Sequence, residues 1–76
     1  MTAAQEAALR FAVHFIGDGA ATYVSALSPE ELEELLAEAE AEWDSRCEEA
    51  RRIGQEGESD LPACLIWCLI QRLRRR

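Results

Sequence analysis

The chain has 76 residues, enough for one small domain (1–76), and 49% of them are apolar, which excludes intrinsic disorder. The formal net charge is −7, so the chain repels nucleic acid and attracts basic surfaces. The charge is unevenly spread, because residues 30–60 carry thirteen acidic residues against three arginines, whereas residues 61–76 carry a net charge of +4. We therefore expect a protein partner with a basic surface and no direct contact with nucleic acid.

The N-terminal part predicts an amphipathic helix over 3–16. One face carries small and aromatic residues at helical spacing, and its alanines would let a neighbouring helix approach closely: Ala4, Ala7, Ala8, Phe11 and Phe15. The other side carries Leu9, Val13 and Ile16. Gly17 suits a helix C-terminus, and the following residues predict a short helix or helical turn at 20–27.

The sequence SPEE predicts the start of a long helix over 29–53. Ser28 suits the N-cap, Pro29 suits the first helical position, and Glu31 can complete a capping box with Ser28. One stripe of this helix is apolar and is expected to face the core: Leu32, Leu35, Leu36, Ala39, Trp43, Cys47, Ala50 and Ile53. Residues 54–60 predict a loop.

The stretch LPACLIWCLI predicts the first turns of a helix over 61–74, with Asp60 or Ser59 as its N-cap. Its apolar residues nearly encircle the helix axis, which is typical of a buried helix, so we expect Leu65 and Leu69 in the core. A membrane span needs about 20 apolar residues, and this stretch supplies ten, so we expect no membrane partner.

These elements predict an all-α fold, a small bundle of three main helices at 3–16, 29–53 and 61–74. The short loop before the last helix would make it antiparallel to the long helix, with Trp43 beside residues 67–71. Two neighbours cannot cover the last helix completely, which leaves an apolar flank for a partner or a second copy of the chain: Trp67, Ile70 and Leu73. A homodimer that meets on this flank is one expected arrangement.

The long helix also carries acidic residues at four-residue spacing, which we take as a candidate binding face: Glu30, Glu34, Glu38, Glu42, Asp44 and Glu48. Like charges at this spacing destabilise a helix by about 0.2–0.5 kcal/mol per pair. Glu42 with Arg46 and Glu48 with Arg52 are the expected favourable pairs. In an antiparallel arrangement, the arginines at 72–76 would lie beside residues 38–42 and offset their charge. The face is either simply solvated or a surface for a basic partner.

The cysteines allow two interpretations. Cys64 and Cys68 lie on one side of their helix, and with Cys47 and His14 they could form a Cys₃His zinc site. The chain lacks the two matched ligand pairs that structural zinc sites use, and free cysteine packs well in cores, so we expect no metal and no cofactor. The odd number of cysteines and an N-terminus unlike a secretory signal predict a reducing, cytoplasmic location.

Catalytic signals are missing from the sequence, because it has a single histidine, no legible nucleophile–base pair and no glycine-rich phosphate loop. We therefore expect a non-catalytic protein-binding module that acts through the acidic helix face and the apolar C-terminal helix. One alternative is a small acidic inhibitor that occupies the nucleic-acid groove of a basic protein. This rests on analogy in size and charge with phage and mobile-element inhibitors such as anti-CRISPR proteins. The other alternative is a metal-stabilised mini-domain.

Overall fold

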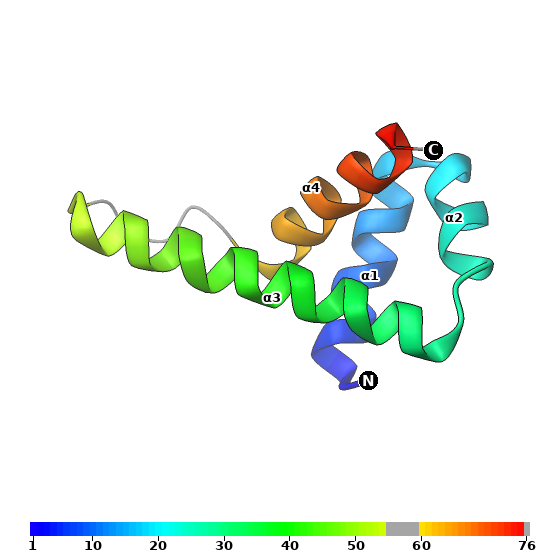
Figure 1. Cartoon of the computed structure of the whole chain (residues 1–76), viewed down its shortest axis with the longest axis horizontal. Helices are drawn as coiled ribbons and strands as arrows, with labels where there is room; N and C mark the ends of the chain where they lie inside the picture. Colours follow the sequence, from blue (N-terminus) through cyan, green and yellow to red (C-terminus); the bar gives the residue numbers. More distant parts are fainter. Residues whose placement is uncertain (55–59, 76) are drawn as a thin grey trace.

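A computed structural model describes residues 1–54 and 60–75 of the chain. In these ranges every regular element is an α-helix, in the order α1 (Ala3–Ile16), α2 (Asp18–Ser25), α3 (Pro29–Arg52) and α4 (Leu61–Arg74) (Figure 1). The all-α prediction is confirmed, and α1 and α4 have the expected bounds. The long helix ends one residue earlier than expected. Most of the predicted loop, residues 55–59, and the last arginine of the tail, Arg76, lie outside the described residues.

The segment expected as a short helix or helical turn at 20–27 is an α-helix that begins and ends two residues earlier, so the described chain has four helices. The reason lies at Gly17, whose φ of 109° is in a region that residues with a side chain rarely adopt. Its amide donates a hydrogen bond to the carbonyl of Val13 (2.9 Å) and closes α1, while its carbonyl accepts one from the amide of Ala21 (3.2 Å). One glycine therefore ends α1 and begins α2 without an intervening loop.

Side-chain caps set the start of three helices. The predicted capping box of α3 is present: the Ser28 hydroxyl accepts from the Glu31 amide, and the Glu31 carboxylate accepts from the Ser28 amide, both at 3.1 Å. That bond from the Ser28 amide lowers the pKa of Glu31. A second capping box, which the sequence analysis missed, joins Thr2 and Gln5 at the start of α1. Asp60 caps α4, as expected.

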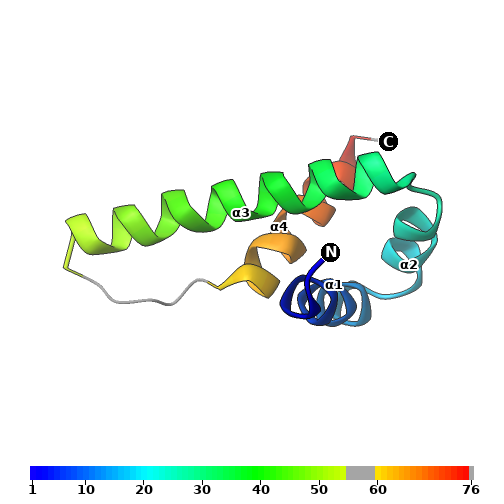
Figure 2. The same ribbon diagram turned by 90° about the horizontal axis from the view of Figure 1, so that it is seen from below.

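The helix α4 is the centre of the fold, since it packs against α1, α2 and α3 (Figures 1 and 2). Its own buried residues are Leu61, Cys64, Leu65, Cys68 and Leu69. The neighbouring helices bury Ala8, Leu9 and Ala12 from α1 and Leu35, Leu36 and Ala39 from α3. The expected core positions Leu36, Leu65 and Leu69 are thus confirmed, whereas Trp43 is half-buried at the edge of the core.

The length of α3 sets the shape of the molecule. At 1.5 Å per residue its 24 residues span about 36 Å, close to the longest dimension of the chain, 39 Å. Figure 1 shows the C-terminal turns of α3 projecting beyond the other helices. Because α4 begins beside the middle of α3, Trp43 lies next to Leu61 and Pro62. Trp43 was expected beside residues 67–71; it lines a groove with the first residues of α4, while Arg46, about one turn further along α3, contacts Trp67.

The fold predicts that two leucines of α4 contribute very differently to the free energy of unfolding. Leu65 is completely buried, so Leu65→Ala should lower the free energy of unfolding by about 2–5 kcal/mol. Leu73 is only half-buried, so Leu73→Ala should lower the free energy of unfolding by clearly less. Urea unfolding followed by circular dichroism measures both. Equal midpoints for the two variants would contradict the central position of α4.

Candidate functional site

The six acidic residues expected to bind a partner all lie on α3, but arginines neutralise part of the row. Glu38 pairs with Arg72 of α4 at 2.9 Å, which confirms that the arginine tail offsets the acidic ladder at this position. Glu42 pairs with Arg46 at 2.8 Å, as predicted. The other four acidic residues of the face are exposed: Glu30, Glu34, Asp44 and Glu48. The charge that a partner would meet therefore lies mainly on the outer side of α3.

Two further arginine contacts concern this face. Hydrogen bonds to Tyr23 and, more weakly, to Glu38 raise the pKa of Arg72, so this one side chain joins α2, α3 and α4. Arg52 was expected to pair with Glu48 but instead contacts Glu49 at 2.6 Å. Both spacings place side chains within reach on a helix, so sequence spacing alone could not choose between them.

The apolar flank of α4 is partly open. Trp67 is 47% exposed, whereas Ile70 and Leu73 are half-buried. The guanidinium carbon of Arg46 lies 5.6 Å from the centre of the Trp67 ring, a cation–π contact worth about 0.5–1 kcal/mol at an exposed site. Trp67 therefore remains available at the surface, although its ring has a partner within the chain.

A more exposed aromatic surface lies on α1, where the sequence analysis expected a packing face. Phe11 is 55% and Phe15 is 67% exposed, and their rings stack with centroids 6.4 Å apart. The helix instead turns the side with Leu9 and Ala12 toward α4. The signal that could have shown this is the spacing of Leu9, Ala12 and Ile16, which also matches one helix face.

An apolar groove of about 440 Å³ lies beside Phe11, between α1, the middle of α3 and the start of α4. It is lined by Ala4, Ala7, Ala8, Phe11, Trp43, Asp60, Leu61 and Pro62. Ala8 and Leu61 are buried, whereas Ala4, Ala7 and Phe11 are exposed at its α1 side. Among the described residues that line it, Asp60 alone is charged. The groove and the two phenylalanines bring together aromatic and small apolar side chains from three helices.

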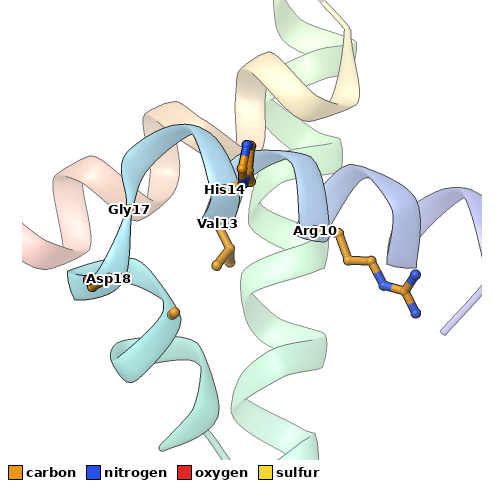
Figure 3. Close-up of a pocket in the computed structure, with 6 residues that line it drawn as sticks. Arg10, Val13, His14, Gly17 and Asp18 are labelled. Atoms are coloured by element: carbon orange, nitrogen blue, oxygen red, sulfur yellow. The ribbon is translucent and has the colours of Figure 1, made fainter.

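A second hollow, of about 470 Å³, lies between α1 and α2 and is lined by Arg10, Val13, His14, Gly17, Asp18 and Ala21. Figure 3 shows that its polar side chains do not converge, since the Arg10 guanidinium group points away from α2. Arg10 is also paired with Glu6 at 2.9 Å. We therefore do not assign a ligand to this hollow.

The candidate metal ligands are not brought together. His14 is exposed on α1, Cys47 is half-buried on α3, and Cys64 and Cys68 are buried in α4. Within residues 1–54 and 60–75, no three His, Cys, Asp or Glu side chains lie where they could hold a metal ion. Burial raises the pKa of Cys64, and it raises the pKa of Cys68 to about 11. Both thiols are therefore neutral core groups at ordinary pH.

Comparisons with family models, with curated proteins and with solved structures found no match to this chain. Among the described helices, none is both long enough and apolar enough to cross a membrane. Function must therefore be inferred from four surfaces: the apolar groove, the two exposed phenylalanines, the flank around Trp67 and the outer side of α3.

The three thiols should differ in reactivity. With a pKa of about 11, roughly one Cys68 side chain in a thousand is a thiolate at pH 8. Iodoacetamide at pH 8 should therefore modify half-buried Cys47 first and Cys64 and Cys68 much more slowly, as mass spectrometry can show. All three should react quickly in urea, which is the control. Fast modification of Cys64 and Cys68 in the folded chain would contradict their burial.

Proposed function

We propose that this chain is a non-catalytic protein-binding module that holds its partner at the apolar groove and at Phe11 and Phe15. The observation that carries the proposal is the exposure of both phenylalanines next to a groove with an almost wholly apolar lining. Small monomeric proteins seldom leave large contiguous apolar patches open to water, and aromatic residues are enriched in protein interfaces. A partner that covers this surface would remove it from water.

The acidic side of α3 has a supporting role in this proposal. Its exposed carboxylates would raise the rate of encounter with a basic partner, whereas the apolar contact would hold the complex. The three cysteines are free, which suits a reducing compartment such as the cytoplasm.

Exposed Trp67 supports a second contact, a homodimer on the α4 flank. Sedimentation tests this part: Trp67→Glu should remove a wild-type dimer, and a wild-type monomer would refute it.

The inhibitor of a nucleic-acid-binding protein remains the second candidate, because Glu30, Glu34, Asp44 and Glu48 are exposed on α3. The two candidates differ in the physical origin of affinity. A groove-blocking mimic of nucleic acid would bind through charge and would lose affinity steeply with added salt. Docking through the phenylalanines would persist, because added salt does not screen apolar contacts.

Capture of proteins from the native host on immobilised chain tests the proposal with two matched double variants. Phe11→Ala with Phe15→Ala should reduce retention of the partner by about tenfold or more, because aromatic anchors dominate interface energetics. Both side chains are exposed, so this variant should keep the wild-type circular dichroism spectrum. Glu30→Gln with Glu34→Gln removes charge on the outer side of α3 and should change retention little at about 0.5 M salt.

The opposite pattern would overturn the proposal. If the phenylalanine variant retains the partner as the wild type does, and the glutamine variant or added salt releases it, the acidic inhibitor is the better description. If neither double variant changes which proteins are retained, both surfaces are excluded as the main contact.

A further inference from the structure

We infer that the occupant of the apolar groove is an amphipathic helix of another protein, with basic residues beside its apolar face. This inference rests on the proposed function and specifies its partner. Three properties of the groove support it: its open shape, the all-helical backbone around it and the sign of the charges at its rim.

The shape of the groove favours a macromolecule over a small ligand. Drug-sized ligands usually bind in clefts that bury about 70–90% of their surface. Here Ala4, Ala7 and Phe11 are exposed at the α1 side, so a small molecule in the groove would remain largely in water. A longer partner could place one apolar side chain against Ala8 and Leu61 and continue along the ridge formed by Phe11 and Phe15.

The backbone around the groove favours a helix over an extended segment. An extended peptide gains affinity by pairing its main chain with the free edge of a sheet. The regular elements of the described residues are all helices, whose backbone groups are largely bonded along each helix, and none is a strand with a free edge. Side chains must therefore make the contact, as in the binding of an amphipathic helix by a hydrophobic groove, where residues at i, i+3, i+4 and i+7 supply the anchors.

The charges near the groove favour a basic partner. Asp60 lies in the lining itself. Glu40, which accepts a hydrogen bond from the Gln5 side chain at 2.6 Å, lies at the neighbouring contact between α1 and α3. These acidic groups complement lysines or arginines that flank an apolar helix face, and they repel acidic helices of the same shape.

A second copy of the chain fits these charges poorly. Each copy carries a formal net charge of −7, so the acidic groups near the groove disfavour a second copy there, a restriction that does not apply to the flank of α4, where residues 61–76 carry a net charge of +4. Several of the chain's arginines already form ion pairs with their own chain: Arg10, Arg46, Arg52 and Arg72. The basic groups needed beside the groove therefore come more readily from a different protein.

Three synthetic helical peptides of about 18 residues, or five turns, provide the test. They share one leucine face and differ only in whether the flanking positions carry lysine, glutamine or glutamate. Titration into isotopically labelled chain, followed by NMR, should shift the Trp43 indole and the amides of Ala7 and Leu61. The lysine peptide should bind at least about tenfold more tightly than the glutamate peptide at low salt, and the difference should shrink at about 0.5 M salt.

Variants locate the binding. Ala7→Gln places a longer uncharged side chain at the groove. It should weaken binding of the lysine peptide by about tenfold, because the added side chain obstructs the apolar contact. Ala37→Gln makes the same change at an exposed position of α3 that does not line the groove and should have no effect. Asp60→Asn removes the charge in the groove lining but keeps a side-chain oxygen to cap α4, so it should weaken binding of the lysine peptide several-fold and leave binding of the glutamine peptide unchanged.

Each contrary result has a distinct meaning. Equal binding of all three peptides in the groove would overturn the basic partner but leave the proposed docking function standing. Lysine-peptide shifts confined to the outer side of α3, or no binding by any peptide, would overturn the helix-in-groove inference. The proposed function fails separately, if the phenylalanine double variant captures the same proteins as the wild type.

Discussion

The structure depends on the close packing of α4 between α1 and α3, and small side chains make this packing possible. Ala12 of α1 and Ala39 of α3 are completely buried, as is Cys64 of α4. Where such residues meet, helix axes can approach closely, and the buried leucines Leu65 and Leu69 then fill the remaining space. A chain of this size can build only one such core, so any residue too large for the close contact must lie at its edge or outside it.

The exposed aromatic residues follow from this constraint. The face of α1 that meets α4 accommodates alanine and leucine, and the two phenylalanines of the same helix are left on the outside. The half-buried Trp43 forms one wall of the groove, where α4 begins against α3. The packing that stabilises the bundle thus also produces the apolar surface that we propose as the docking site. Charge is arranged differently, since Arg72 and Arg46 neutralise the carboxylates near α4 and leave the outer carboxylates exposed.

The parts of the fold that depend on local interactions could be predicted from sequence. The capping box at Ser28 and the glycine at position 17 mark helix ends through bonds within a few residues, and the apolar circumference of α4 required burial whatever its neighbours were. The contact between Arg72 and Glu38 followed from the antiparallel course of two adjacent helices.

The candidate site could not be predicted, because it depends on choices between similar alternatives. Both sides of α1 are apolar, one with phenylalanines and alanines and the other with Leu9, Val13 and Ile16. The structure buries Leu9 and Ala12 and leaves Phe11 and Phe15 exposed, a choice that the pattern of α1 alone does not specify. The position of Trp43 likewise depends on where α4 begins along α3, which no local signal in either helix specifies. These two tertiary choices create the groove.

The orientation of α1 is therefore the claim to test most directly. The chain contains two phenylalanines, so incorporation of fluorophenylalanine gives one ¹⁹F NMR signal for each. A soluble paramagnetic probe broadens signals from side chains that water reaches. Both phenylalanine signals should broaden strongly when the folded protein is measured in dilute solution. The signal of a fluorinated leucine at the buried position 65 should broaden much less. Protection of both phenylalanine signals to the level of that leucine would show that α1 is turned the other way.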